Sequence, residues 1–445
     1  MAKSPETNGH IDPAKAYPSK SFFIDMLTQD IGLSDCILDL IDNSINSLVV
    51  RENLDVMQHL IEGSKAPKIK ATIDITFNPA KFTISDNCGG ISLSDAQNQV
   101  FLFGKPKVDK THAGLGVYGI GMKRAFFKIG RQIDITSNTI EEQWKISINV
   151  DEWESKPDKW EFDFADHQVK KAPVGKTALT VARPSPTIAA QFGMKSFAEI
   201  LRARIASAYA LFITSGLSIT LNSHTVTADL PELVESAEIK PVRKLFKEDG
   251  VDILIQAGLT PRSDRTPRGW YVFCNGRLVL PANQTDQTGW GLDEFPVFHS
   301  KYNHFYGRVC FRSKDVRKLP WTTTKDGVTR ESPIYQKALS EMRVQARPVL
   351  DFFNRLYPDD PAESEQERES FDKAKPTSAE KAASQPNTPF QAPPPKPRDD
   401  VSVKIQYSRP KKQVKKIAAH LQRPNMSAVR VGEHTFDAFY ERYCK

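Results

Sequence analysis

The chain has 445 residues, of which 39% are hydrophobic and 26% charged, a composition typical of two to three globular domains. Lys and Arg outnumber Asp and Glu by seven, and residues 401–445 alone hold ten basic and three acidic residues, so the rest of the chain is neutral. This distribution excludes a uniformly basic nucleic-acid-binding surface and leaves one basic C-terminal segment.

The targeting signals of membrane and secreted proteins are missing from the sequence. No run of about 18 apolar residues predicts a transmembrane helix, and the polar start MAKSPETNGHIDPAK lacks the apolar core of a signal peptide. The five cysteines are scattered without a C-x-x-C pair, which argues against a disulfide framework or a cysteine-based zinc site. We therefore expect a cytoplasmic protein that has no membrane partner.

The first part of the chain predicts an α+β fold. Apolar periodicity indicates helices, and short alternating runs indicate strands without the regular strand–helix alternation of a doubly wound fold. The expected helices cover residues 21–27, 32–50 and 125–129, and the expected strands cover 69–77, 81–85, 132–137, 144–150, 160–164 and 177–182. A glycine-containing segment, residues 89–121, precedes the third helix.

The pattern changes near Pro184 and predicts a second α+β domain, a linker and a small C-terminal module. The second domain has expected helices at 197–212 and 332–356 and strands at 217–222, 251–257, 269–274 and 307–311. Residues 361–400 hold eight of the thirty prolines and only two large apolar side chains, Phe371 and Phe390, so we expect a disordered linker. We expect a strand at 401–407, a basic helix at 410–421, and a strand-like then helical segment at 427–445.

Three polar motifs stand out in the first domain. In the run LIDNS, Asp39 and Asn43 lie one helical turn apart and share a face, where Asn offers an oxygen to Mg²⁺ and Asp a proton acceptor. The run DNCGGI follows a predicted strand, so Asp86 could accept from an exocyclic amine while its glycines admit a flat base. Taken singly, these runs also fit a solvated helix face and an ordinary turn.

The third motif is GLGVYGIGMK, residues 114–123, placed directly before a helix. Backbone N–H groups and a helix N-terminus suit phosphates, and Lys123 adds a positive charge. The run is neither a Walker A loop nor a dinucleotide-binding fingerprint, because the lysine spacing and the parallel strand–turn–helix unit are missing.

The order and spacing of the three motifs resemble the GHKL ATPase superfamily, which includes gyrase B, the heat-shock-90 chaperones, histidine kinases and MutL. Within that group the run LIDNS looks most like the MORC-type branch and its prokaryotic relatives. The resemblance covers roughly residues 20–185 and implies a Bergerat-type two-layer α/β sandwich that binds ATP and Mg²⁺. The run GKTALTV, residues 175–181, is similar to the late strand of the family, whose Thr helps to hold the adenine-binding Asp.

The resemblance implies roles for individual residues. Asn43 would coordinate Mg²⁺, Asp39 would activate water, Asp86 would bind the adenine amine, and Gly90 would shape the base pocket. Residues 92–116 would form a mobile lid over the nucleotide. The complete set expected to contact ATP is Asn43, Asp86, Gly90, Ile91, Gly114, Gly116, Val117, Tyr118, Gly119, Ile120, Gly121, Lys123 and Thr177.

Two positions depart from the pattern of the superfamily. The family usually has Glu where this chain has Asp39, whose side chain is one methylene shorter, so we expect slow hydrolysis. Cys88 stands where the family has a glycine, and a positive φ there would strain the backbone.

The second domain is similar to the transducer (S5-type) domain of MORC and MutL. LPWTTTKD resembles the loop whose lysine reaches the γ-phosphate, which implies that role for Lys325, and GWYVFCNGR resembles a strand and turn of that domain. Lys325 is equally compatible with an ordinary surface lysine.

We therefore expect five segments: an N-terminal strap at 1–30, the ATP-binding domain at 31–185, the transducer-like domain at 186–358, the linker at 359–400 and the basic module at 401–445. The resemblance implies a clamp that forms a homodimer on binding Mg-ATP, hydrolyses ATP slowly and acts on DNA or in a phage-defence assembly. The basic module is a candidate DNA contact. The alternatives are a non-catalytic ATP-binding switch that recruits protein partners and a chaperone-like ATPase.

Overall fold

The structure is a computed structural model that describes residues 18–104, 112–116, 119–358, 364–377, 386–395 and 405–444. Two compact units can be separated, one formed by residues 1–357 and 364–393 and the other by 358–363 and 394–445. Each unit is described by itself. No helix among the described residues is both long and apolar enough to cross a membrane.

The first unit contains an eight-stranded mixed sheet in the order β5-β4-β3-β6-β2-β1-β7-β8. Most neighbours pair antiparallel, whereas β1 and β7 run parallel. These strands are β1 (Thr72–Asn78), β2 (Lys81–Asp86), β3 (Gly130–Asn138), β4 (Glu142–Asn149), β5 (Phe164–Val169), β6 (Lys176–Pro184), β7 (Ser218–Leu221) and β8 (His224–Thr225). Buried and exposed residues alternate strictly along β1, as a sheet with one covered face requires.

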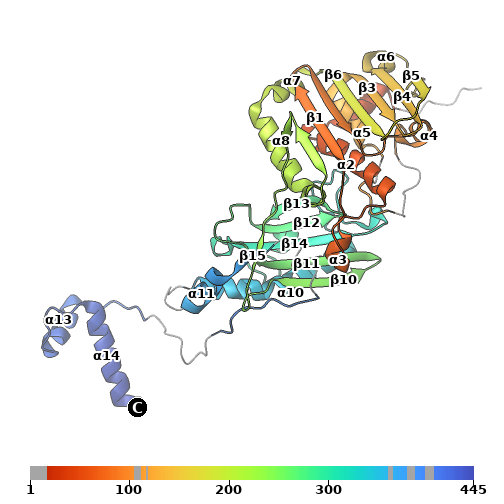
Figure 1. Ribbon diagram of the computed structural model, residues 1–445. Coiled ribbons are helices and arrows are strands. Elements are labelled where there is room, and N and C mark those ends of the chain that lie inside the picture. Colours follow the sequence, from red (N-terminus) through yellow and green to blue (C-terminus); the bar gives the residue numbers. More distant parts are fainter. Residues whose placement is uncertain are drawn as a thin grey trace, which may run out of the picture. The chain divides into compact units, whose positions relative to one another are not determined.

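The helices of this region form the second layer of an α+β sandwich, as expected (Figure 1). The long helix α2 packs on α5, and their apolar residues share one continuous core with the sheet. The helical elements are α1 (Lys20–Thr28), α2 (Leu33–Glu52), α3 (Gln58–Glu62), α4 (Leu93–Asp95), a π-helical turn (Ala96–Val100), α5 (Gly121–Ile129), α6 (Val150–Glu154), α7 (Pro186–Gly193), α8 (Lys195–Ala208) and α9 (Ala210–Thr214).

A second sheet of five strands follows in the order β10-β11-β14-β12-β13. Its members are β10 (Val242–Glu248), β11 (Val251–Leu259), β12 (Gly269–Cys274), β13 (Arg277–Asn283) and β14 (Phe305–Arg312). Helix α10 (Pro333–Leu356) packs on β10, β11 and β14, and every residue of β12 is buried. The sequence therefore predicted both α+β regions correctly, including the helices that became α2 and α10.

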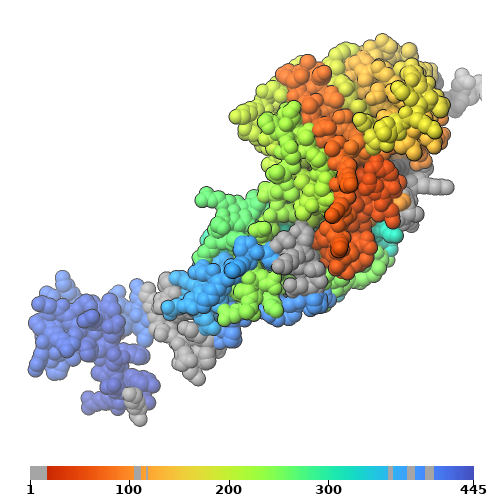
Figure 2. Space-filling view, in the orientation of Figure 1, coloured from red at the N-terminus to blue at the C-terminus, as the bar shows by residue number. Residues whose placement is uncertain are grey.

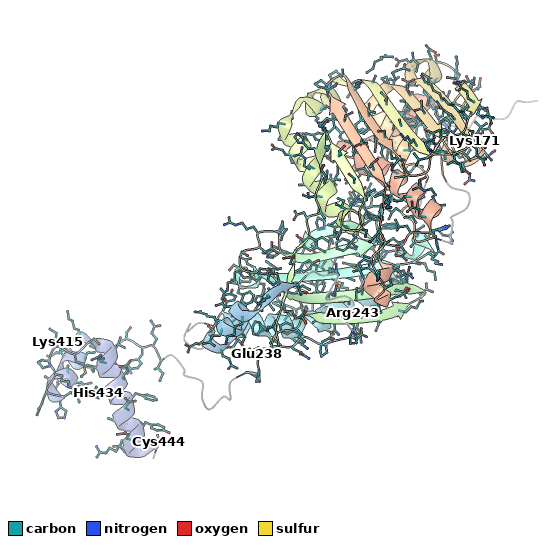
Figure 3. All side chains as sticks on the ribbon, in the orientation of Figure 1. Lys171, Glu238, Arg243, Lys415, His434 and Cys444 are labelled. Atoms are coloured by element: carbon teal, nitrogen blue, oxygen red, sulfur yellow. The ribbon has the colours of Figure 1, made fainter. Side chains whose placement is uncertain are left out.

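Arg243 on β10 ties this sheet to α3. Its guanidinium donates to the carbonyl oxygens of Leu60 and Ile61, at 3.1 and 3.4 Å. The residue is buried, and Figure 3 labels it in the second sheet region. Such charged hydrogen bonds are stronger than those between neutral groups. The contact therefore joins β10 of the second sheet to the helix that directly precedes β1 of the first sheet.

Part of the expected linker is folded onto the second sheet region. Helix α11 (Glu365–Lys373) is followed by β15 (Lys375–Thr377), which pairs antiparallel with β9 (Leu233–Glu235). Blue and green surfaces adjoin in this region in Figure 2. The two apolar residues of the linker explain the difference. Phe371 is buried against His304 and Arg262, and Phe390 packs on Phe352.

The second unit contains α13 (Lys411–His420) and α14 (Ala428–Tyr443), which contact each other. Residues 405–407 form no strand, and α14 is helical from Ala428 onward, so the strands expected in these places are wrong for the described residues. The side chain of Ser427 caps α14 by accepting from Arg430 N, which starts the helix earlier than periodicity predicts. The strand expected at 160–164 is also displaced, because β5 begins only at Phe164.

Candidate functional site

Helix α2 carries the first motif at the centre of the first unit. Its residues Asp39 and Asp42 are buried, at 6% and 2% exposure, whereas Asn43 is exposed. A buried carboxylate needs partners because burial disfavours its charge. The partners of the two aspartates therefore determine the chemistry that this helix can support.

Asp39 is held by the start of α5. Its Oδ2 accepts from Arg124 Nη2 at 2.5 Å, and a Cβ on Gly121 would lie only 3.1 Å from the Asp39 carboxyl carbon. Burial raises the pKa of Asp39, against the opposing effect of Lys325 and Arg124. The glycine at the first position of α5 thus lets the helix approach this carboxylate closely.

Asp42 binds three groups that come from later parts of the chain. Its Oδ2 accepts from Lys325 Nζ at 2.7 Å, and its Oδ1 accepts from Arg277 Nε at 3.1 Å and from the Tyr209 hydroxyl at 2.8 Å. Burial alone would raise the pKa of Asp42, but Lys325 and Arg277 outweigh it and place that pKa below its usual value. Asp42 is therefore an ionised carboxylate within a hydrogen-bonded network.

These contacts form what we call the buried charge cluster, which consists of Asp39, Asp42, Arg124, Arg277 and Lys325. Three cations face two carboxylates, so the cluster has one positive charge in excess. Among the described residues, the Nε of Arg124 is a buried donor without a hydrogen-bond partner. An excess cation and an open donor favour an anionic ligand.

Lys325 reaches this cluster from a tight loop of the second sheet region. Its backbone has φ 55°, and its Nζ lies 3.8 Å from Asp39 Oδ1. Asp326 accepts from the hydroxyls of Thr322 and Thr324, at 2.9 and 2.5 Å, which fixes the turn. The Lys325 side chain is only 8% exposed, so it is not the surface lysine that the sequence also allowed, and its role at the site stays a prediction.

Asn275, in the turn before β13, connects the second sheet region to the glycine-rich segment. Its Nδ2 donates to the carbonyl oxygens of Gly114 and Ser313, both at 2.9 Å, and its Oδ1 accepts from Ser313 N at 2.9 Å. Gly276 follows with φ 85°, and a Cβ there would meet Val56 at 2.4 Å. The Asn-Gly-Arg turn is therefore packed directly on the first domain.

At the other end of the site, Asp86 terminates β2. Its Oδ2 accepts from the Ser44 hydroxyl at 2.6 Å, and its Oδ1 accepts from Cys88 N at 2.8 Å. Burial raises the pKa of Asp86, although the hydrogen bonds from Ser44 and Cys88 oppose this. Helix α2 thus orients, through Ser44, the Asp86 carboxylate, which the sequence analysis predicts to bind the adenine amine.

Thr177 lies opposite Asp86 in the pairing of β6 with β2. The hydroxyls of Thr177 and Ser137 are 3.0 Å apart, and the Ser137 hydroxyl accepts from Ile91 N at 2.8 Å. We call Asp86, Gly90, Ile91 and Thr177, together with their support Ser137, the Asp86 end. Within it, Ser137 links the Ile91 N–H to the Thr177 hydroxyl.

Close backbone approach explains the glycines at this end. Gly90 has φ 72°, and a Cβ there would lie 1.9 Å from Asn138 O. A Cβ on Gly175 would lie 1.9 Å from Gly89 O. Cys88 is not among the residues with positive φ, so the strain expected at this position does not arise.

The glycine-rich segment is described only in part. Val117 and Tyr118 lie outside the described residues, as do residues 105–111 of the expected lid. Asn46 Oδ1 accepts from the backbone N–H groups of Leu115 and Gly116, at 3.1 and 3.2 Å. Gly119 has φ 67°, and Ile120 precedes the start of α5 at Gly121.

Lys123 is not beside this segment's open backbone groups. It is 1% exposed, and its Nζ donates to the carbonyl oxygens of Val100 and Leu102, both at 2.7 Å. The lysine therefore fastens the turn after the π-helical segment to α5. The next residue, Arg124, is the cation that contacts the buried carboxylate.

Sequence reasoning missed Asp42, Arg124, Asn46 and Tyr209 as members of the site. Asp42 and Arg124 each adjoin a residue that was assigned, and both stand in otherwise apolar helical surroundings, which was a usable signal. Tyr209 carried no such signal, because an aromatic residue within an apolar helix is more often part of the core.

Comparison with known proteins supports the resemblance for one region of the chain. Residues 31–175 match the family model described as histidine kinase-, DNA gyrase B-, and HSP90-like ATPase. No curated protein matches the chain. The match covers α2, the whole of α5 and the strands β1–β5, and so contains Asp39, Asn43 and Asp86.

Proposed function

We propose that this protein binds Mg-ATP between the Asp86 end and the buried charge cluster and hydrolyses it slowly. The similarity of residues 31–175 to histidine kinase-, DNA gyrase B- and HSP90-like ATPases supports ATP binding and ATPase activity. The observation that carries the proposal is the position of Lys325, 3.8 Å from Asp39 although the two residues come from different sheet regions. A lysine and an acid so placed suit a γ-phosphate and its attacking water.

The base would bind at the Asp86 end. The Asp86 carboxylate would accept from the adenine amine, and Gly90 would shape the base pocket, because its missing Cβ lets the backbone pack against Asn138 O. The phosphates would lie toward Gly119 and the start of α5, where the helix N-terminus favours an anion. The excess positive charge of the buried charge cluster supports the same placement.

Asn43 fits the role of a Mg²⁺ ligand. It is exposed on the face of α2 one turn after Asp39, and its amide oxygen is a hard ligand. No cluster of three or more His, Cys, Asp or Glu suited to a metal occurs among the described residues. Mg²⁺ is often bound through one or two protein oxygens together with substrate phosphates and water, and it would neutralise phosphate charge there.

Asp39 would act as the general base. Arg124 fixes Oδ2, and Oδ1 would take a proton from water as the water oxygen bonds to the γ-phosphorus. The bond from that phosphorus to the β,γ-bridging oxygen breaks, and ADP and phosphate leave. Because the Asp39 side chain is short and paired with Arg124, slow turnover is expected.

What the ATP-bound protein does is a separate proposal from ATP hydrolysis itself. We propose that two copies associate through their N-terminal regions on binding ATP, as GHKL proteins commonly do, and that this clamp acts on DNA in a maintenance or phage-defence assembly. The basic residues of α13 are the candidate DNA contact: Lys411, Lys412, Lys415 and Lys416. Figure 3 labels Lys415 in this unit.

The DNA contact can be tested by removing residues 401–445 and measuring DNA affinity at several salt concentrations. Loss of affinity with a shallower salt dependence is expected. Unchanged affinity and salt dependence would show that the segment makes no DNA contact. Sedimentation with a non-hydrolysable ATP analogue tests the homodimer, and a monomer with and without the analogue would contradict it.

A non-catalytic ATP-binding switch is the second candidate. The observation that favours it is the salt bridge between Asp39 and Arg124, because a base held by a cation is a weaker proton acceptor. Such a protein would bind ATP and recruit partners without turnover.

The deciding experiment is phosphate release from Mg-ATP, with nucleotide binding measured in parallel. Asp39→Asn should retain binding and lose turnover by about 10²- to 10⁴-fold, and Asn43→Ala should lose Mg-dependent binding. Asp35→Asn is the matched control, because Asp35 lies on the same helix and pairs with Arg204 outside the cluster. Tight binding without turnover in the unaltered protein would favour the switch, and absence of nucleotide binding would contradict both candidates.

A further inference from the structure

Asp42 differs from Asp39, the other buried acidic residue of α2, in the origin of its partners. It receives hydrogen bonds from Lys325 in the 319–328 loop, from Arg277 at the start of β13 and from Tyr209 between α8 and α9. Asp39, in contrast, has its shortest contact within the first domain, with Arg124. Asp42 is thus the common acceptor for chain segments that follow the first domain.

We propose that Asp42 is a positioning residue that anchors the second sheet region to α2 and holds Lys325 in place for the reaction. The proposal rests on the proposed ATPase function for its consequence, but the anchoring itself requires no nucleotide. Asp42 would touch neither ATP nor the attacking water. Its effect would pass through Lys325.

The distances show which carboxylate holds Lys325. Its Nζ is 2.7 Å from Asp42 Oδ2 and 3.8 Å from Asp39 Oδ1, so Asp42 makes the hydrogen bond and Asp39 only a longer ion pair. If Asp42 were neutral, Asp39 would be the nearest remaining carboxylate for this ammonium group. A tighter Lys325–Asp39 pair would weaken Asp39 as a base.

Lysine also needs such an anchor for a conformational reason. Its side chain has four rotatable bonds, and fixing it costs entropy that a single directed acceptor can offset. The loop already holds Lys325 at φ 55°, a backbone conformation that non-glycine residues rarely adopt. Asp42 therefore fixes the ammonium end of a side chain whose backbone end is fixed by the turn.

Arg277 and Tyr209 keep Asp42 itself from rotating. The single hydroxyl proton of Tyr209 is shared between Asp42 Oδ1 and Leu38 O, which both lie 2.8 Å from the hydroxyl oxygen, and the Arg277 guanidinium stacks on the Tyr209 ring at 4.8 Å. Both partners are buried, so water does not compete for the carboxylate. The anchor is therefore a closed network and not a surface ion pair.

The first test measures Lys325 without any nucleotide. The full-length protein is treated with an amine-acetylating reagent, and the rate at Lys325 is followed by mass spectrometry against Lys195, whose side chain is 91% exposed. Asp42→Asn should raise the rate at Lys325 by about tenfold or more, because a charged hydrogen bond is lost. Asp35→Asn should leave it unchanged. An unaltered rate in folded Asp42→Asn would overturn the proposal.

A milder variant covers the case in which Asp42→Asn does not fold. Tyr209→Phe removes the hydroxyl hydrogen bond to Asp42 and keeps the ring beneath Arg277. It should raise the Lys325 rate by about threefold, the scale of one such bond. No change in this variant would contradict the role of the network in holding the lysine.

The second test connects the anchor to turnover. Asp42→Asn should lower kcat by about tenfold to 100-fold with little change in nucleotide affinity, since its effect passes through one positioned cation. Combining it with Lys325→Gln should lower kcat no further than Lys325→Gln alone. Independent, multiplying effects would contradict the proposal. If the unaltered protein has no turnover, the ATPase function fails while the acetylation result still decides the anchor.

Discussion

The two ends of the candidate site are built in different ways. The Asp86 end uses neutral donors and close backbone contacts, all contributed by residues 44–177. The buried charge cluster uses five charged groups, of which Arg277 and Lys325 come from the second sheet region. One end is complete within a single domain, whereas the other exists only when both regions are packed together.

The two ends would therefore serve different steps. The Asp86 end would bind the nucleotide base, and the buried charge cluster would act on the phosphates. The first domain alone could bind the adenine base, because Ser44 and Cys88 already orient the Asp86 carboxylate. The charges that we propose to face the phosphates depend on the docking of Lys325 and Arg277 against α2. Changes at the Asp86 end should therefore affect affinity, and changes at the interface should affect turnover and the coupling of the two regions.

The largest effect is expected from Gly90→Ala at the Asp86 end. A Cβ there would lie 1.9 Å from Asn138 O, and φ is 72°, so collision and backbone strain together should cost about 3–5 kcal/mol of unfolding free energy. Urea denaturation measures this. Gly193→Ala, where the nearest atom is 3.6 Å away, is the control and should be nearly neutral. Equal stability of the two variants would contradict the close approach.

Asn275→Ala should weaken the interface between the two regions. The change leaves the Gly114 and Ser313 carbonyl groups and Ser313 N–H without their partner, at a cost of about 2–4 kcal/mol. Hydrogen exchange should also become faster at residues 114–116. Asn222→Ala is matched, since Asn222 has φ 47° as well but accepts only from Phe77 N, at 2.9 Å. A similar loss in both variants would argue against a special role for Asn275.

The pH dependence of nucleotide affinity should report on Asp86. Burial raises the pKa of this carboxyl, so it becomes protonated at higher pH than an ordinary Asp, whose pKa is about 3.9. Protonation weakens the acceptor for the adenine amine, and affinity should fall as pH is lowered through that raised pKa. The ratio of affinities between the unaltered protein and Asp86→Asn removes the titration of ATP itself. A ratio independent of pH would contradict this role.

The smallest effect on nucleotide affinity is expected from thiol modification, because the thiols at the two ends are buried. Burial raises the pKa of the Cys36 thiol, beside Asp39, to about 12, and it also raises the pKa of the Cys88 thiol, beside Asp86. Neither thiolate should form near pH 8, whereas Cys444 is exposed. A thiol reagent should modify Cys444 first and leave nucleotide affinity unchanged. Fast loss of affinity that persists in Cys444→Ser would show that one end is open to the reagent.

The same contrast explains how far the site could be predicted from the sequence. Asp39, Asp86 and Gly90 lie in short runs whose spacing follows local geometry, one helical turn or one strand end, so their neighbourhoods could be predicted. The pairing of Asp42 with Lys325 spans 283 residues and depends on how two domains pack. No local pattern encodes such a contact.

Two differences outside the cluster have related causes. Lys123 was expected at the phosphates because of its place after the glycines, but the carbonyl groups of Val100 and Leu102 bind its ammonium group. The composition of residues 364–377 and 386–395 predicted disorder. Instead, Phe371 packs on His304 and Phe390 packs on Phe352, both in the second sheet region. In both cases the deciding partner is remote in sequence.

The central claim is that Asp86 and the glycines beside it bind the base of ATP. The most direct test is calorimetric titration of the full-length protein with Mg-ATP and Mg-GTP, beside Asp86→Asn and the control Asp134→Asn, which removes only a surface ion pair with Lys145. We predict binding of ATP in preference to GTP, a loss of affinity of about tenfold to 100-fold in Asp86→Asn and no loss in the control. Equal affinity for ATP in all three proteins would contradict the account.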